Sequence, residues 1–225
     1  MKKLFLFLFI SILIPNSTWQ SINSSVPNPM NMDLISSNIE NTVIKFSMDG
    51  FHLIPVDDSK NFIIKTENGA SLLEKGFPDL QKITSSIIIP DAADMSVSIV
   101  SYKYEVFENI DIAPSKGNLT RDINPNQVPF IYDDIYKEDV FYPNQISELG
   151  TPYIVRDLRG QTITFYPFQY NPQTKVLRAY SEIVVEVNSN GLSDLNALQM
   201  LENLSSVEEI TNSVKQFRIH INSVT

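Results

Sequence analysis

The sequence contains no cysteine, only two histidines and a single tryptophan. Without cysteine there is no thiol catalysis, no cysteine-based zinc site and no disulfide, so the fold depends on its hydrophobic core alone. The histidines, His52 and His220, are far apart in the chain, and no G-x-S-x-G, H-E-x-x-H or glycine-rich phosphate motif accompanies them. We therefore expect a chain that is not an enzyme, and we interpret His52 as a structural residue.

Positive charge is also scarce. The chain has 17 lysines and arginines against 26 aspartates and glutamates, which gives a formal net charge of −9 at pH 7. A polyphosphate backbone repels such a chain, so nucleic acid is not expected as a partner, whereas a basic protein surface is favoured. The acidic residues that are adjacent in sequence point different ways on a strand or helix and are interpreted as solvated charges. These pairs are Asp57-Asp58, Asp133-Asp134 and Glu208-Glu209.

One long apolar run is present, at the start of the chain. A short positive region, Met1–Lys3, precedes a continuously apolar segment, Leu4–Ile14. This order predicts a secretory signal peptide over residues 1–20, because the run is too short and too sharply ended for a transmembrane helix. We expect cleavage between Thr18 and Ser21, although no A-x-A pattern is present. The mature protein would then be periplasmic or extracellular, with no membrane association.

Glycine and proline are few, 7 and 13 in 225 residues, which excludes a collagen-like or repetitive polymer. With 43% hydrophobic and 19% charged residues, the chain is expected to be globular. Residues 21–40 are rich in Ser, Asn and Pro and predict a flexible leader. After it, β-rich segments predict strands at Thr42–Met48, Phe51–Val56, Asn61–Lys65, Ile83–Pro90, Met95–Glu108, Tyr153–Arg156, Thr162–Tyr170 and Lys175–Val187.

Turn signals separate several of these segments. Asp49-Gly50, Arg159-Gly160 and Asn171–Thr174 each lie between two predicted strands, which indicates antiparallel hairpins. Because many strands carry apolar residues on both faces, two packed sheets are needed.

The apolar spacing becomes near-helical after Gly191, with Ser193 as a candidate N-cap. The predicted fold class is therefore mainly β. We expect an antiparallel, jelly-roll-like β-sandwich over residues 41–190, followed by a C-terminal helical extension over residues 191–225.

Residues Ala113–Pro129 lack apolar rhythm and predict a long loop, which in a compact domain is usually functional or disordered. Within it, Asp122–Asn126 has the D-x-N-x-N start of a calcium loop, but Gln127 replaces the turn glycine and Asp133 takes the twelfth position. We expect Asx-turns here and no metal site. The triplet Asn118-Leu119-Thr120 fits a glycosylation acceptor, a pattern that arises by chance in chains rich in Asn and Ser.

Three aromatic residues, Tyr166, Phe168 and Tyr170, share one face of a predicted strand. Such a stripe is more often part of a core than a ligand platform. The platform interpretation nevertheless defines an alternative function, a secreted β-sandwich module that binds a glycan or a protein.

Several segments resemble, in order, the propeptides of gingipain-like (family C25) secreted cysteine proteases. They lie between Gly76 and Val187, a region that makes up roughly half of the chain. Directly after the first of them, Gln81 stands where the family usually has proline. The segments are Gly76–Leu80, Ile87–Pro90, Ile112–Arg121, Val128–Gly160 and Pro167–Tyr180.

The resemblance implies a β-sandwich prodomain that assists the folding of a gingipain-like cysteine protease catalytic domain and blocks its active site, with no cofactor. An acidic pocket specific for Arg or Lys could be filled by a basic side chain of the long loop. Arg121 is the preferred residue, because a guanidinium can engage a carboxylate through two hydrogen bonds, and Lys116 is the alternative. Asn118 lies between them on the predicted inhibitory loop.

Overall fold

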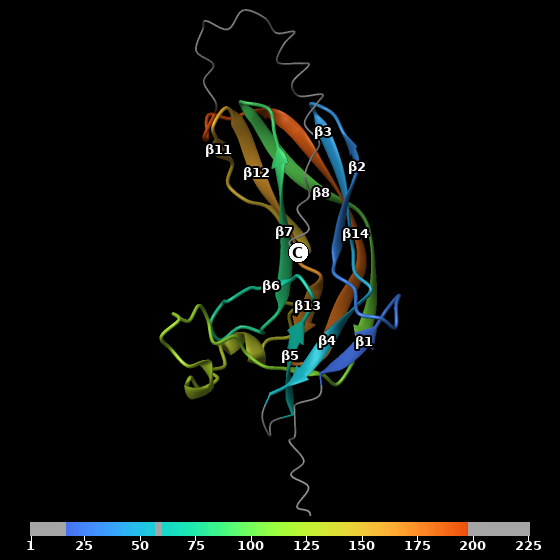
Figure 1. Cartoon of the computed structure of the whole chain (residues 1–225), viewed down its shortest axis with the longest axis vertical. Coiled ribbons are helices and arrows are strands. Elements are labelled where there is room, and N and C mark those ends of the chain that lie inside the picture. Colours follow the sequence, from blue (N-terminus) through green and yellow to red (C-terminus); the bar gives the residue numbers. More distant parts are fainter. Residues whose placement is uncertain (1–16, 57–59, 198–225) are drawn as a thin grey trace, which may run out of the picture.

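The computed structural model describes residues 17–56 and 60–197, and it is mainly β (Figure 1). Most of the expected signal peptide therefore lies outside the described residues. The elements are β1 (Thr18–Ser21), β2 (Asn31–Ser37), β3 (Asn41–Ser47), β4 (Gly50–Pro55), β5 (Asn61–Lys65), β6 (Ala70–Ser71), β7 (Gln81–Ile88), β8 (Ala93–Phe107), β9 (Asp111–Ile112), the 3-10 helices η1 (Pro125–Gln127) and η2 (Asp134–Lys137), β10 (Ser147–Leu149), β11 (Tyr153–Val155), β12 (Leu158–Phe165), β13 (Phe168–Asn171) and β14 (Val176–Leu192).

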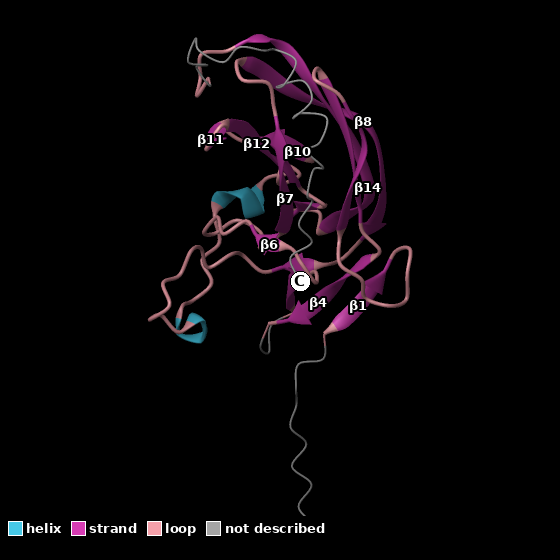
Figure 2. Ribbon diagram, turned by 45° about the horizontal axis from the view of Figure 1, so that its top comes forward, coloured by secondary structure: helices cyan, strands magenta, loops and turns pink. Residues whose placement is uncertain are grey.

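The strands form three sheets that curve around one interior (Figures 1 and 2). One has the order β13-β14-β3-β2, with β8 along the other edge of β14. The second has the order β10-β12-β7-β6, with β11 also paired to β12, and the third has the order β1-β4-β5-β9. The pairs are antiparallel apart from the short parallel contact of β5 with β9. The predicted mainly antiparallel β class is confirmed.

Aromatic side chains from different sheets meet in the core. Phe46 of β3 stacks on Phe165 of β12 with ring centroids 5.7 Å apart, and Phe51 of β4 meets Phe168 of β13 at 5.2 Å. All four side chains are fully buried. Because buried aromatic rings contribute large apolar areas, these two contacts join all three sheets into one hydrophobic core.

The aromatic stripe predicted on one strand belongs to this core. Tyr166, Phe168 and Tyr170 are 7%, 0% and 1% exposed. The predicted single strand is divided at Tyr166-Pro167 into β12 and β13, because proline has no N–H for the ladder. The stripe offers no ligand platform, and the glycan-binding alternative loses the residues on which it was based.

The segment expected to be a flexible leader, residues 21–40, contains a strand. β2 pairs with β3 along Asn31–Ser37, and Met30 and Met32 enter the core. Apart from Met32, the side chains of β2 are exposed, so the strand carries no apolar alternation in its sequence. β1 lies within the expected cleavage region and pairs with β4, and the cleavage site itself stays a prediction.

Two predicted turns are not turns. β3 and β4 belong to different sheets, so Asp49-Gly50 is no hairpin. Instead, Gly50 allows β1 to approach closely, because a Cβ at this position would lie 2.5 Å from the ring of Trp19. Arg159-Gly160 lies inside β12, and the turn between β11 and β12 falls at Arg156, whose φ is 58°.

The described part of the expected helical extension is not helical. β14 continues to Leu192, and the Ser193 hydroxyl accepts a hydrogen bond from the N–H of Leu195 in a turn. The rest of the predicted extension lies outside the described residues. In residues 17–56 and 60–197, no helix has the length and apolar character needed to cross a membrane.

Candidate functional site: a projecting, anchored loop

The long loop predicted near Ala113–Pro129 projects from one side of the molecule (Figures 1 and 2). We define the projecting loop as residues 113–133, between β9 and η2. Apart from a bridge between Pro114 and Pro78, it takes part in no strand pairing, and residues 120–127 are all exposed. A segment this exposed is available to a partner, provided that the structure holds its base in place.

Gly76 joins the two ends of the projecting loop. Its N–H donates to the carbonyl of Ser115 at 2.9 Å, and its carbonyl accepts from the N–H of Asp133 at 3.1 Å. The φ of Gly76 is 89°, in the region that favours glycine, and a Cβ here would lie 3.1 Å from the Asp133 Cβ. The N–H of Ser115 also donates to the carbonyl of Phe77 at 2.7 Å. Gly76–Leu80, one of the segments that carry the resemblance, thus closes the neck of the loop.

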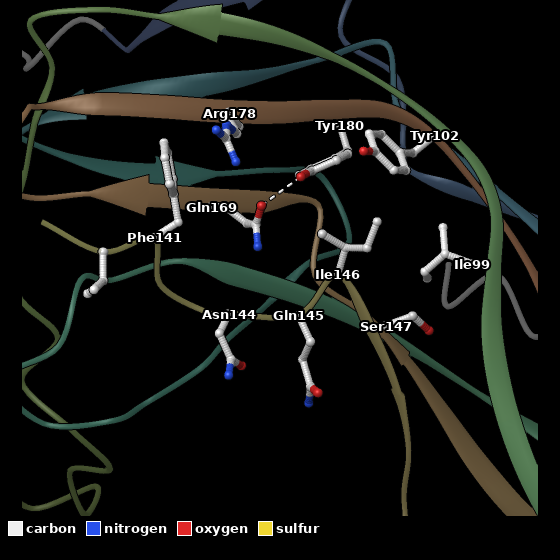
Figure 3. Close-up of a pocket in the computed structure, with 11 residues that line it drawn as sticks. Ile99, Tyr102, Phe141, Asn144, Gln145, Ile146, Ser147, Gln169, Arg178 and Tyr180 are labelled. Atoms are coloured by element: carbon white, nitrogen blue, oxygen red, sulfur yellow. Dashed lines mark hydrogen bonds between the residues drawn. The ribbon is translucent and has the colours of Figure 1, made fainter.

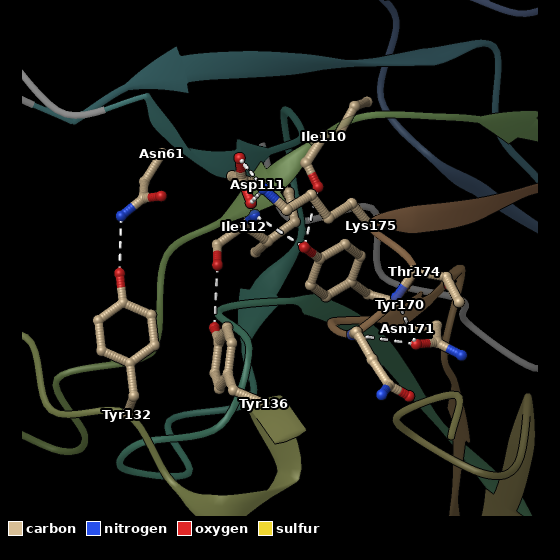
Figure 4. Close-up of polar contacts among 11 residues, drawn as sticks. Asn61, Ile110, Asp111, Ile112, Tyr132, Tyr136, Tyr170, Asn171, Thr174 and Lys175 are labelled. Atoms are coloured by element: carbon tan, nitrogen blue, oxygen red, sulfur yellow. Dashed lines mark hydrogen bonds and ion pairs between the residues drawn. The ribbon is translucent and has the colours of Figure 1, made fainter. Parts of the chain in front are cut away.

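Two tyrosines hold the backbone where the chain enters the loop (Figure 4). The Tyr170 hydroxyl donates to the carbonyl of Ile110 at 2.8 Å and accepts from the N–H of Ile112 at 3.4 Å. The Tyr136 hydroxyl donates to the carbonyl of Ile112 at 2.9 Å. Tyr170 comes from the core and Tyr136 from η2, so the loop entrance is bonded to the sandwich on one side and to the loop exit on the other.

Charged and polar contacts surround this base. Lys175 pairs with Asp111 at 2.9 Å, and Asn61 donates to the Tyr132 hydroxyl at 2.7 Å. Desolvation by burial raises the pKa of Tyr170 to about 12 and raises that of Tyr136 further. Both hydroxyls are therefore protonated across the physiological pH range. The hydrogen bonds that they donate to the loop entrance do not depend on pH in that range.

Replacing Tyr136 with phenylalanine should lower the free energy of unfolding by about 1 kcal/mol, because the carbonyl of the buried residue Ile112 loses its donor. Urea denaturation would measure this loss. We also expect faster amide hydrogen exchange in residues 113–133. Tyr132→Phe is the matched control, since Tyr132 is exposed and contacts the side chain of Asn61. Equal exchange in the two variants would contradict an anchoring role for Tyr136.

Arg121 lies in a turn of the projecting loop. The N–H of Ile123 donates to the carbonyl of Thr120 at 3.1 Å, which places Arg121 and Asp122 at the corner. Arg121 is exposed, and among the described residues it takes part in no ion pair. Asn118, the third predicted site residue, is also exposed and directly follows Gly117, whose φ is 81°.

Lys116 is engaged inside the loop. Its Nζ atom donates to the carbonyl of Pro125 at 2.8 Å and lies 4.2 Å from the centroid of the Phe130 ring. These contacts connect the two limbs of the loop. Lys116 would have to leave both partners before it could enter another protein's pocket, whereas Arg121 has no such constraint. The structure therefore separates the two basic candidates into a connecting residue and an available one.

The side-chain oxygens of the calcium-like stretch serve the backbone. Asn124 Oδ1 accepts from the N–H of Asn126 at 3.0 Å, and Asp133 Oδ1 accepts from the N–H of Ile135 at 3.3 Å. Both contacts are N-caps of short 3-10 helices. A hydrogen bond from the Thr120 side chain lowers the pKa of Asp122. The Asx-turns expected for this stretch are confirmed at Asn124 and Asp133.

Asp79 belongs to the segment Gly76–Leu80 that closes the neck of the loop. Its Oδ1 atom is buried with no hydrogen-bond partner. Desolvation raises the pKa of this carboxyl group, although Lys65 and Ser71 counteract the shift. A raised folded-state pKa means that stability falls as the pH rises through that value. Asp79→Asn should therefore raise the free energy of unfolding at pH 7 but not below pH 4. Urea denaturation at both pH values tests this, and an equal effect at the two would contradict it.

Elsewhere, the described residues offer no assembled catalytic set. His52 packs on Trp19 with centroids 4.9 Å apart and faces Glu67 at 3.5 Å, in keeping with a structural role. His220 lies outside the described residues. An open cleft between β8, β14 and residues 140–147 is lined by no histidine and no carboxylate (Figure 3), so it lacks a general base. In it, Arg178 stacks on the ring of Phe141 at 3.7 Å.

The residues that support the loop are not recognisable from the sequence. Tyr136 and Tyr170 act on a backbone segment 24 to 60 positions away along the chain. The one available signal is Gly76, because a glycine followed by proline two residues later often marks a special backbone conformation.

Comparisons with known proteins give a consistent assignment. The family model Propeptide_C25 matches residues 23–216. Gingipain R2 of Porphyromonas gingivalis is 37% identical over 185 residues, which cover 80% of this chain and 25% of the relative. Lys-gingipain of the same organism is 23% identical over 149 residues, 64% of this chain and 9% of the relative. The chain thus spans about a quarter of the length of Gingipain R2.

Two solved structures share the fold. The complex of the Porphyromonas gingivalis RgpB pro- and mature domains contains a chain with a TM-score of 0.70 and 36% identity. The match covers 81% of this chain and 95% of that one. A structure that concerns the zymogenic latency of gingipain K has a TM-score of 0.66 at 18% identity, with 78% and 100% covered, and supports the fold alone.

Proposed function

This chain belongs to the Propeptide_C25 family, and from that premise we propose that it acts as a prodomain that restrains a secreted gingipain-type cysteine endopeptidase. In this role it blocks the active site of the catalytic domain and assists its folding. Its partner is the catalytic domain of such a protease. The chain itself holds no cysteine, so it cannot supply the thiol nucleophile of a cysteine protease.

The observation that carries the proposal is the position of Arg121. It stands exposed at the corner of a turn, on a loop whose neck is closed by Gly76 and whose entrance is held by Tyr136 and Tyr170. A loop fixed in this way loses little conformational entropy when it binds, because its base is already ordered. The projecting loop therefore suits insertion into a concave site.

The guanidinium of Arg121 determines the chemistry of the proposed contact. A pocket that accepts a substrate arginine needs a carboxylate or a set of carbonyl oxygens, and a guanidinium can satisfy a carboxylate with two parallel hydrogen bonds. Inside a protein pocket this pairing is stronger than in water, since the effective dielectric constant is lower. Arg121 would thus imitate the side chain of a substrate, while Asn118 and Lys116 shape the loop around it.

Family membership also supports a secreted protein. That residues 1–20 are the signal peptide, with cleavage near Thr18–Ser21, is part of the proposal. The acidic chain would meet a protease surface of opposite or mixed charge without competition from nucleic acid.

An inhibition assay tests the proposal. A purified chain that lacks residues 1–16 but keeps every described strand would be titrated against a gingipain-type protease that cleaves after arginine. We expect competitive inhibition of that enzyme and none of papain, a cysteine protease of unrelated fold. Absence of inhibition, or equal inhibition of both enzymes, would contradict the proposed function.

A further inference from the structure

β8 is an exposed edge strand of unusual length. Among the described residues it pairs with β14 alone, so its other edge has backbone groups without a strand partner. Every residue from Ser98 to Val106 is exposed, including Tyr102 at 52% and Val106 at 50%. Long apolar edges promote pairing with another strand, and proteins usually protect them with proline, charge or bulges. β8 has no proline, and its exposed stretch from Ser98 to Val106 carries two charges, Lys103 and Glu105.

The ladder between β8 and β14 defines which part of this edge is regular. The register shifts at Val100, which has no partner on β14, so the strand bends at that residue. The ladder also shifts between Lys103 and Tyr104, but there the extra residue is Ser181 of β14, so β8 itself carries no insertion from Ser101 to Phe107. The centre of this seven-residue stretch is Tyr104. A second strand that pairs with the whole of this stretch would therefore be centred opposite Tyr104.

We propose that two copies of this chain associate through antiparallel pairing of β8 with β8, about a two-fold axis at Tyr104. In that register Lys103 of each copy lies directly opposite Glu105 of the other, so the symmetric pair contains two opposite-charge contacts. Tyr102 of each copy lies opposite Val106 of the other. Aromatic residues opposite β-branched residues, and opposite charges facing each other, are the combinations that stabilise cross-strand pairs.

Alternation along the strand sorts these contacts onto two faces. Tyr102, Tyr104 and Val106 share one face, and the rings of Tyr102 and Tyr104 are 6.1 Å apart. Lys103 and Glu105 share the other face. A shift of the register by one residue would instead place a charged side chain opposite an apolar one, so the sequence of the edge selects this arrangement.

The occupant is a second copy and not the protease, because the loop and this edge lie on different sides. In both overall views the projecting loop extends away from the side where β8 follows the rim (Figures 1 and 2). A protease bound at Arg121 would leave the β8 edge uncovered. The pairing is therefore independent of the proposed inhibition, and each copy in the dimer keeps its loop free.

The absence of cysteine from the chain allows a direct test by crosslinking. In a two-fold pair centred at Tyr104, the two copies of that residue face each other at a Cα separation of about 4.5–5.5 Å, which a disulfide can bridge. Tyr104→Cys should thus give a disulfide-linked dimer under mild oxidation. Val106→Cys, exposed on the same face, is the matched control and should give no disulfide-linked dimer. A mixture of Tyr102→Cys and Val106→Cys chains should crosslink to each other.

Charge substitutions test the same register without oxidation. Glu105→Lys places lysine opposite lysine twice, and we expect the dimer dissociation constant to rise at least roughly tenfold by sedimentation equilibrium. Lys103→Glu should act similarly, although it also loses the ion pair with Glu182. Mixing the two variants restores opposite charges at both positions and should recover dimers that neither variant forms alone.

Three results would overturn the proposal. The wild-type chain could sediment as a monomer at all accessible concentrations, or the Val106→Cys chain could crosslink with itself as readily as Tyr104→Cys. Alternatively, Glu105→Lys could weaken protease inhibition while leaving the sedimentation unchanged, which would make β8 a protease contact. None of these results depends on whether Arg121 fills a protease pocket.

Discussion

Replacing Arg121 with alanine should weaken inhibition of an arginine-cleaving gingipain-type protease by about 2–5 kcal/mol, as for the loss of one partner from a buried charge pair. This corresponds to a rise of roughly 30- to 4,000-fold in the inhibition constant. The expected loss is large because the carboxylate in the protease pocket would remain buried without its partner. The folded prodomain should be unaffected, since Arg121 is exposed and makes no described ion pair.

Two further variants define the role of the guanidinium. Arg121→Lys keeps the charge but loses the two-pronged geometry, so an intermediate inhibition constant is expected. Lys116→Ala removes the contacts with Pro125 and Phe130 and should weaken inhibition much less, through a looser loop. Steady-state inhibition assays at fixed salt would measure all three. Inhibition constants unchanged by both Arg121→Ala and Lys116→Ala would contradict the loop account.

The largest expected loss of stability comes from Arg159. This side chain is 1% exposed, and its guanidinium donates to four backbone carbonyls, those of Pro90, Ala93, Leu195 and Asn196, at 2.7–3.0 Å. Hydrogen bonds from a charged donor contribute about 1.5–3 kcal/mol each, partly offset by the cost of burying the charge. Arg159→Met should therefore lower the free energy of unfolding by at least about 3 kcal/mol.

The contacts of Arg159 also hold the segment that follows β14. They join the turn between β7 and β8 to Leu195 and Asn196, just beyond β14. Arg159→Met should accordingly make the segment around Leu195 and Asn196 more sensitive to limited proteolysis. Arg156→Met is the matched control, because Arg156 is exposed in the same hairpin. Urea midpoints that shift equally in the two variants would show that Arg159 does not hold this junction.

The strands themselves were largely predictable, because apolar and β-branched residues recur at most of them. β3, β4, β5, β7, β8 and β14 lie within a few residues of their predicted bounds. β2 escaped prediction because Met32 is its only buried side chain. Alternation of apolar and polar residues along a strand indicates that one of its faces is buried. A strand whose side chains are nearly all exposed shows no such alternation.

Two hairpin turns were predicted wrongly at glycines that instead allow distant segments to pack closely. Gly50 follows aspartate as in a hairpin, yet it is required by the ring of Trp19, which lies 31 positions earlier along the chain. Arg159-Gly160 similarly lies within a strand, with the Arg159 side chain bonded to residues of two distant segments. Such long-range contacts leave no local trace, because only the folded chain brings the partners together.

The candidate site was partly predictable. The resemblance to the family located the loop and made Arg121 and Lys116 the candidates for filling a protease pocket. Only the structure distinguishes the two, because Lys116 contacts Pro125 and Phe130. The supports at Gly76, Tyr136 and Tyr170 depend on backbone hydrogen bonds across the fold. Pattern reasoning on side chains does not predict bonds to carbonyl groups.

Protection of the catalytic thiol of the protease tests the central claim most directly. The enzyme would be incubated with saturating chain, treated with iodoacetamide, and its alkylated cysteine quantified by mass spectrometry. A loop that occupies the active site through Arg121 predicts strong protection by the wild-type chain, and little by Arg121→Ala at a concentration where the wild type saturates. Full alkylation while the wild-type chain remains bound would show that it binds outside the active site and would contradict the account.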